Sequence, residues 1–227
     1  MTFRRYALYF VAGDSELSRF GAAWLGWDAD AGAIVPQPEL PLPMAEITEA
    51  PRKYGFHGTL HWPFRLQGPV EENCIHFREQ IAAFCASRAP IVLDAMELAR
   101  LGRFLALVPA GDTAALTALA ADLVRTVEAF RHPPEEAELT RRQKPHLSAR
   151  QKELLTRWGY PYVMDQFRFH MTLTGRLKDA QLAQVEAVLT EQLAAVVPRP
   201  FVIDAISMMG EDEAGYFHVI ERVPLTG

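Results

Sequence analysis

The pentapeptide Phe56-His57-Gly58-Thr59-Leu60 recurs later in the chain as Phe169-His170-Met171-Thr172-Leu173. Four of the five positions are identical, among them a histidine and, two residues on, a threonine. Residues two apart on a β-strand point to the same side, so each histidine shares a face with its threonine. The other positions of each copy are apolar or small and turn to the opposite side. The repeat therefore predicts two strands that each present a His–Thr pair in front of an apolar core face.

The chain continues in the same way after each copy. We expect the copies to lie on strands over residues 54–62 and 166–174, each followed by a helix, a strand, a tight connection and another strand. These elements are predicted at residues 70–88, 91–99 and 104–109 after the first copy, and at 178–197, 201–209 and 216–223 after the second. The matched order predicts an α+β fold built from a duplicated unit, with two antiparallel sheets flanked by helices around a central cleft. The break at His132-Pro133-Pro134 divides this single bilobal domain, 1–227, into lobes 1–132 and 133–227.

Composition limits the class of protein. With 49% hydrophobic and 22% charged residues, the 227-residue chain is typical of a globular protein. A net charge of −5 argues against an extended nucleic-acid surface, and no apolar run is long enough to cross a membrane. Cys74 and Cys85 fall on one predicted helix, roughly 16 Å apart, which is too far for a disulfide. Free thiols favour a reducing compartment, so we expect a cytoplasmic monomer with no membrane contact.

Two histidines and two hydroxyls suit acid–base chemistry at phosphorus. A histidine titrates near pH ~6.5, so one imidazole can accept a proton while another donates one. The hydroxyls can bind the oxygens of a phosphodiester, in which attack and departure occur on opposite sides of phosphorus. This scheme needs no metal and no other cofactor. His61 follows His57 on the same face of the predicted strand, but about 13 Å away, too far for one metal ion to bridge.

The motifs and their surroundings resemble the 2H phosphoesterase superfamily and, within it, the bacterial DUF1045 group, which is associated with phosphonate metabolism. That superfamily is similar in its two histidine-x-threonine/serine motifs and in its pseudo-symmetric bilobal α+β fold. The similarity covers nearly the whole chain and is carried by residues 5–10 (RYALYF), 19–21 (RFG), 54–57 (YGFH), 157–163 (RWGYPYV) and 167–177 (FRFHMTLTGRL). The chain departs from the pattern at His61, where we expect a lysine in many relatives.

The resemblance implies that His57 and His170 are the catalytic pair and that Thr59 and Thr172 bind the substrate phosphate. It also implies metal-independent hydrolysis of a small cyclic phosphodiester, such as a ribose cyclic phosphate, with a small phosphorylated substrate as the partner. Two alternatives stay open. One is an RNA-end enzyme, either a 2′,3′-cyclic phosphodiesterase or a 2′-5′ ligase. The other is a non-catalytic protein that binds a nucleotide or sugar phosphate.

Further residues around the motifs are candidates for substrate contact. Cationic and imidazole side chains can bind a second phosphate or a carboxylate, and tyrosine rings can stack on a base or sugar. These candidates are Tyr54, His61, Arg168, Arg176, Tyr160 and Tyr162.

Overall fold

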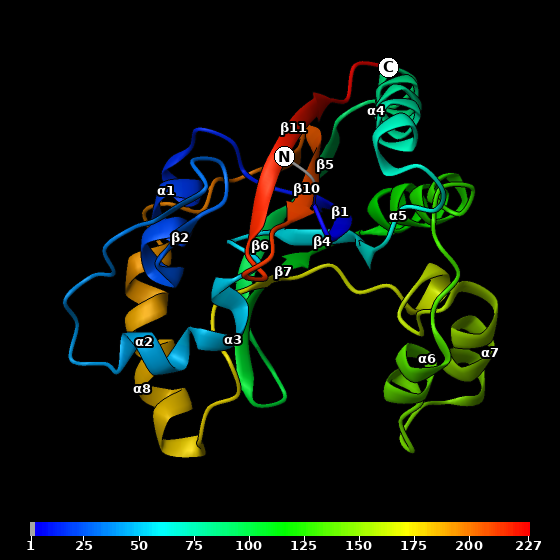
Figure 1. Cartoon of the computed structure of the whole chain (residues 1–227). Coiled ribbons are helices and arrows are strands. Elements are labelled where there is room, and N and C mark those ends of the chain that lie inside the picture. The colour runs from blue at the N-terminus through cyan, green and yellow to red at the C-terminus, as the bar shows by residue number, and fades with distance from the viewer. Residues whose placement is uncertain (1–2) are drawn as a thin grey trace.

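Seven antiparallel strands form the central sheet of the computed structural model, which describes residues 3–227 (Figure 1). In order across the sheet they are β11 (Phe217–Pro224), β10 (Ala205–Glu211), β1 (Arg5–Phe10), β4 (Gly58–Phe64), β8 (Met171–Thr172), β7 (Phe104–Ala110) and β6 (Ala95–Leu101). Two further pairs of strands lie outside it: β2 (Trp27–Asp28) with β3 (Ala33–Ile34), and β5 (Ile91–Leu93) with β9 (Phe201–Ile203). The predicted α+β class with antiparallel strands is confirmed.

The central sheet has two halves that meet at a narrow seam. Within the described residues, β4 and β8 pair through Gly58 and Met171 alone. A Cβ atom at position 58 would lie 2.2 Å from the Phe169 ring, so the absence of a side chain on Gly58 lets the two strands meet. The two sheets expected from the sequence are therefore joined edge to edge at the repeated motif.

Strands from the two parts of the sequence are interleaved across this seam. β10 and β11 follow the second motif, yet β10 pairs with β1, beside the first motif, and β11 pairs with β10. Conversely, β6 and β7 follow the first motif, yet β7 pairs with β8 of the second motif, and β6 pairs with β7. The hairpin after each motif thus crosses to the half that holds the other motif. Each half of the sheet consequently contains strands from both sides of residue 132.

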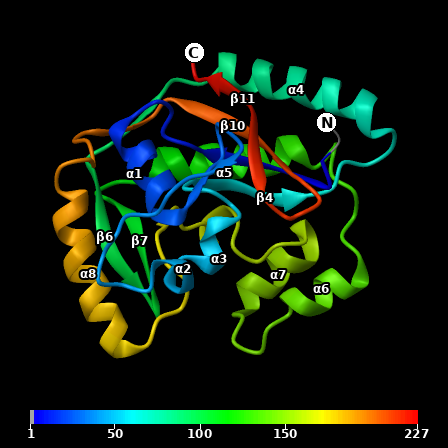
Figure 2. The ribbon, with the colours of Figure 1, turned by 60° about the vertical axis from the view of Figure 1, so that its left-hand side comes forward.

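Helices flank the sheet on both sides (Figure 2). The figure shows α4 running past β10 and β11, α8 beside β6 and β7, and α6 paired with α7. The bounds are α1 (Glu16–Leu25), α2 (Met44–Ile47), α3 (Glu49–Arg52), α4 (Val70–Ala86), α5 (Ala114–Val127), α6 (Glu136–Arg142), α7 (Ala149–Trp158) and α8 (Asp179–Leu193), with a 3₁₀ turn, η1 (Met164–Gln166). Both free cysteines lie on α4. No helix within residues 3–227 is long and apolar enough to span a bilayer.

Local sequence signals set the ends of the helices that frame the site. The Ser15 hydroxyl accepts a hydrogen bond from the Ser18 amide at the start of α1, and Gly26 ends this helix in the left-handed conformation. Ser148 and Gln151 form a capping box at the start of α7. These caps stabilise each helix by about 1 kcal/mol.

The apolar residues of both motifs lie in the main core, as the alternation predicts. Phe56 and Leu60 from the first copy, and Phe169, Met171 and Leu173 from the second, are all buried in one cluster. The Trp24 indole of α1 donates a hydrogen bond to the Leu173 carbonyl at 2.8 Å. Both motifs are therefore fixed from behind by the same core.

The two motif strands differ from the sequence prediction in length. β4 runs through Pro63 to Phe64, because its register against β1 shifts on either side of His61 and breaks the ladder there. β8 is reduced to Met171 and Thr172, since residues 167–170 run beside the sheet without strand pairing. His57 and His170 each lie one residue outside a paired strand.

Candidate active site

The four polar motif residues converge at the seam between β4 and β8. Gly58 pairs with Met171, and the strands are antiparallel. Continuing this register by one residue in each direction places His57 opposite Thr172 and Thr59 opposite His170. The two histidines then occupy diagonal positions, for which Cβ atoms lie roughly 7–8 Å apart. This spacing leaves room for one phosphorus atom between the two rings.

Both histidines have the same tautomer, fixed by the same local contact. Nδ1 of His57 lies 2.9 Å from the Gly55 carbonyl oxygen, and Nδ1 of His170 lies 2.9 Å from the Arg168 carbonyl oxygen. A carbonyl oxygen can only accept, so each Nδ1 carries the proton and donates it. In the neutral rings Nε2 is therefore the free base, available for proton transfer.

His57 is held between aromatic and polar neighbours. Its ring stacks on the buried Tyr9 ring, with the centroids 3.8 Å apart, and its Nε2 accepts a hydrogen bond from the Thr59 hydroxyl at 3.1 Å. Burial lowers the pKa of His57 to about 4. The hydrogen bond to the Gly55 carbonyl raises this pKa, and positive charge on His170 lowers it. His57 is consequently neutral at pH 7.

His170 lies in a more open setting. Its bond to the Arg168 carbonyl is exposed to solvent, whereas the equivalent bond of His57 is partly buried. The Phe104 ring is its aromatic neighbour, with the centroids 6.0 Å apart at an angle of 52°. Its Nε2 has no hydrogen-bond partner among the residues that the structure describes.

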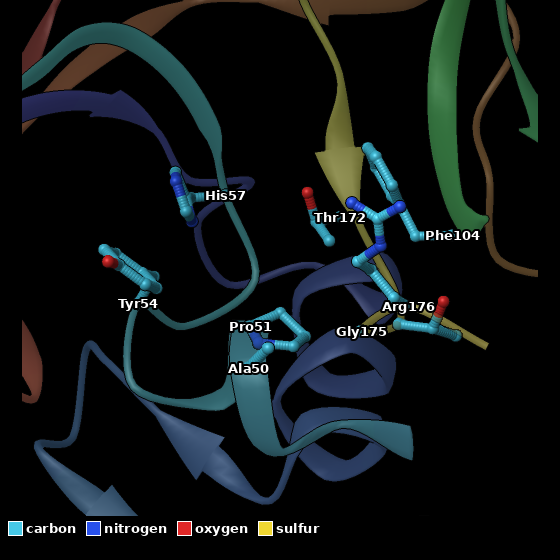
Figure 3. A pocket seen from close by; sticks show the side chains of 9 residues that line it. Ala50, Pro51, Tyr54, His57, Phe104, Thr172, Gly175 and Arg176 are labelled. Carbon is cyan, nitrogen blue, oxygen red and sulfur yellow. The ribbon is translucent and has the colours of Figure 1, made fainter. Parts of the chain in front are cut away.

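Two adjoining cavities open in front of the motifs. The first has a volume of about 280 Å³, and Figure 3 shows His57 with Tyr54 on one side of it and Thr172 with Arg176 on the other. The second, of about 490 Å³, contains Thr59 and His170. The histidines thus line different cavities, which share Phe104 and meet where the Thr59 hydroxyl contacts His57. Of the described residues, no aspartate or glutamate lines either cavity.

Five of the six further candidates line these cavities. Tyr54 and Arg176 belong to the first cavity. Arg168, Tyr160 and Tyr162 belong to the second. The Arg168 guanidinium donates to the Asp165 and Phe167 carbonyls, so part of its hydrogen-bonding capacity is used within the protein.

The expectation that His61 shares the face of His57 is wrong. The register shift between Thr59 and His61 adds a residue to β4 and breaks the simple alternation of side chains. His61 is 1% exposed, stacks on Trp62 and lines neither cavity. Burial lowers the pKa of His61 to about 3, and its Nε2 has no hydrogen-bond partner, so it is a neutral core residue.

Sequence reasoning missed three aromatic residues of the site: Tyr9, Phe104 and Trp62. Tyr9 faces Thr59 across the β1–β4 ladder and supports the His57 ring. Phe104 lines both cavities, and Trp62 stacks on Tyr160 in the second, with the centroids 4.9 Å apart. Strand alternation on 5–10 could have placed Tyr9 on one face, but only the sheet order shows which strand lies beside it.

The residues present do not form a recognisable metal centre. Within residues 3–227, no three His, Cys, Asp or Glu side chains gather as metal ligands. The polar groups that meet at the seam are imidazole nitrogens and hydroxyls.

Comparison with known protein families identifies the family of this chain. Residues 59–218 match the family described as "Protein of unknown function (DUF1045)". The chain belongs to the DUF1045 family. The match includes His170 and Thr172 and begins two residues after His57. Membership of DUF1045, inferred above from the flanks of the motifs, is confirmed.

This DUF1045 chain is similar to two curated proteins, each named "Ribose 1,5-bisphosphate phosphokinase PhnN". The protein from Janthinobacterium sp. (strain Marseille) is 38% identical over 98% of this chain, and the one from Laribacter hongkongensis (strain HLHK9) is 31% identical over 93%. The aligned regions are 51% and 49% of those proteins. The chain therefore spans about half the length of the curated relatives that it matches.

Solved structures resemble the DUF1045 chain only distantly. Escherichia coli LigT complexed with 3′-AMP aligns over 100% of both chains with a TM-score of 0.47 and 13% identity. A structure described as a phosphoesterase aligns over the same extent with a TM-score of 0.44. These scores are too low to support an argument about function, which therefore depends on the site itself.

Proposed function

We propose that this DUF1045 protein is a phosphoesterase that opens a small cyclic phosphodiester by two-histidine acid–base catalysis, without a metal. The observation that carries the proposal is the pair of Nε2 atoms at the seam. Each Nε2 is oriented by the same Nδ1–carbonyl bond of its ring, and the pairing of Gly58 with Met171 beside the histidines supports a placement of the two rings on either side of a common point.

No aspartate or glutamate of the described residues lines the two cavities, which supports an anionic substrate. The chain carries a net charge of −5, yet both cavities are lined without a carboxylate within the described residues. A phosphate group entering there meets no like charge, and it finds Arg176 on one side and Arg168 on the other.

The geometry supports different roles for the two rings. His57 is neutral at pH 7, so its Nε2 accepts a proton from the attacking water. As the water oxygen bonds to phosphorus, one ester P–O bond breaks, and the imidazolium form of His170 donates a proton to the departing sugar oxygen. The Thr172 hydroxyl donates to a non-bridging phosphate oxygen. The Thr59 hydroxyl, which donates to Nε2 of His57 in the free protein, gives up this position to the attacking water. The product is a phosphomonoester with a free hydroxyl.

The names of the curated relatives indicate which substrates to test first. Those proteins are named for a ribose bearing phosphates at positions 1 and 5, so a ribose cyclic phosphate is the leading candidate for this chain. Their kinase activity is not supported here by a phosphate-binding loop, since the sequence contains no Gly-x₄-Gly-Lys-Ser/Thr motif.

A second substrate class is favoured by the aromatic wall of the second cavity. Trp62 and Tyr160 stack at an angle of 12°, and Tyr162 packs edge-on against Tyr160 and is 41% exposed. Exposed aromatic rings beside a phosphate site are suited to stacking on a nucleobase. A nucleoside 2′,3′-cyclic phosphate is therefore the alternative substrate.

A substrate panel tests the proposal directly. Protein treated with EDTA is incubated with ribose cyclic phosphates, nucleoside 2′,3′-cyclic phosphates and RNA ends, and products are followed by ³¹P NMR. We expect hydrolysis of at least one small cyclic phosphate, and a loss of about 10³-fold in kcat for His57→Ala and for His170→Ala. Circular dichroism shows that both variants are folded. Full activity in both variants, or no turnover of any cyclic phosphate, would refute the proposal.

A further inference from the structure

Arg176 lines the first cavity, and no acidic side chain among the described residues forms an ion pair with its guanidinium. Its side chain lines the cavity with His57 and Thr172, and Figure 3 shows the guanidinium directed toward Thr172 and Phe104. Within residues 3–227 it forms no ion pair and no hydrogen bond. Its neighbours differ: Arg100 pairs with Glu186, and Arg103 donates to the Leu177 carbonyl. A guanidinium free of internal partners can take an external anion.

The backbone on either side of Arg176 is firmly held. The Gly175 amide donates to the Ile47 carbonyl at 2.7 Å, and the Leu177 amide donates to the Arg103 carbonyl at 2.7 Å. One residue further back, the buried Thr174 hydroxyl accepts from the Leu105 amide at 3.0 Å. The Arg176 side chain therefore extends from a fixed point, so its reach into the cavity is set by the fold.

Arg176 is placed to one side of the reacting centre. The proposed mechanism already assigns two Nε2 atoms and the Thr172 hydroxyl to the scissile phosphate, at the seam between the cavities. Arg176 lines only the cavity that holds His57, and it follows Thr172 by four residues, which is at most about 13 Å of extended chain. An anion bound by Arg176 is therefore one that lies beside the scissile phosphate in the same molecule.

We propose that Arg176 binds a second phosphate on the substrate, so that the preferred substrates are sugar cyclic phosphates that also carry a phosphomonoester. This inference rests on the proposed phosphoesterase function. The planar guanidinium offers two parallel N–H groups to phosphate oxygens, which gives both charge and direction. Ala50, Pro51 and Tyr54 line the same cavity, and these side chains suit the apolar face of a sugar.

The test compares matched substrates and matched variants. The substrates are a ribose cyclic phosphate with a phosphate at O5 and the same compound without it. We expect wild-type kcat/KM to favour the phosphorylated compound by at least about tenfold, and Arg176→Gln to reduce that preference by about 10- to 100-fold, mainly through KM. Arg176→Lys keeps the charge without the paired donors and should retain part of the preference. Arg141→Gln removes an exposed positive charge from α6, outside both cavities, and should leave the preference as it is.

A binding measurement separates this inference from the proposed function. Ribose 5-phosphate has the second phosphate but no bond to cleave, so its Kd, measured by calorimetry, reports on Arg176 even if no substrate is hydrolysed. We expect Arg176→Gln to weaken binding by about tenfold or more, and Arg141→Gln to have no effect. Equal Kd values for wild type and Arg176→Gln would overturn the inference. So would an equal loss of kcat/KM on both ribose substrates, since Arg176 would then bind the scissile phosphate itself.

Discussion

The two copies of the motif share nearly the same sequence but occupy different surroundings. In the first, His57 stacks on a buried tyrosine and accepts a hydrogen bond from Thr59. In the second, the His170–carbonyl bond is open to solvent, and no described residue forms a hydrogen bond with Nε2. The local sequence sets the tautomer, which is the same in both, whereas the neighbouring strands set the environment. A pair of similar side chains can divide acid and base roles in this way, because burial changes the proton affinity of one of them.

The largest expected effect tests the different roles of His57 and His170 with a substrate whose leaving group needs no general acid. On a cyclic phosphate, His57→Ala and His170→Ala should each lose about 10³-fold in kcat. On a p-nitrophenyl phosphodiester the leaving group departs without a proton. His170→Ala should then lose less than about tenfold, while His57→Ala should remain about 10³-fold impaired.

Initial rates of nitrophenolate release give both values, and thermal unfolding of the two variants serves as the control for folding. The opposite pattern, in which His57→Ala recovers on the activated substrate, would assign the base to His170 instead.

A smaller effect concerns pH. A base works in its unprotonated form, and burial lowers the pKa of His57 to about 4. Activity should therefore be retained as the pH falls through 6 and be lost only as it approaches 4, so the acidic limb of kcat/KM should have an apparent pKa below about 5. A profile of kcat/KM between pH 4 and 8 measures this limb in the free enzyme.

Two substitutions of Tyr9 sharpen the test. Tyr9→Leu removes the ring that covers His57, so the acidic limb should move toward about 6.5, the ordinary pKa of histidine. Tyr9→Phe keeps the stacked ring and should leave the limb in place. An acidic limb near 6.5 in the wild type would show that His57 is not the base.

The smallest effect distinguishes the two threonines. The Thr59 hydroxyl already donates to His57, whereas no described residue hydrogen-bonds the Thr172 hydroxyl, which faces the first cavity. Thr172→Val should therefore reduce kcat/KM by about tenfold and Thr59→Val by about threefold, and both variants should remain folded. Steady-state kinetics on the preferred cyclic phosphate measures the two losses. A larger loss for Thr59→Val would place that hydroxyl on the substrate in the reacting complex.

Much of the site could be predicted because its signals are local. The two-residue period predicted that His57 and Thr59 share a face, where they form a hydrogen bond, and the apolar positions behind both motifs proved to be core residues. The helix caps at Ser15 and Ser148 also depend on short-range chemistry. For these features the sequence within a few residues determines the conformation.

The features that could not be predicted depend on partners far away in the sequence. Tyr9 meets His57 only because β1 pairs with β4. His61 was misplaced because a register shift in β4 is a property of two strands together. The crossing of the hairpins β6–β7 and β10–β11 could not be predicted either. The alternation of apolar residues along a strand shows which face is buried, but it does not show which strand is its neighbour.

The crossing of the hairpins has a consequence for the order in which the protein is made. The strand bearing the first motif is flanked by β1, and β1 needs β10 as its other neighbour. Ala205–Glu211 leaves the ribosome about 150 residues after His57. Until then the surroundings that keep this imidazole unprotonated are incomplete, so the nascent chain carries His57 well before the neighbours of that ring are in place.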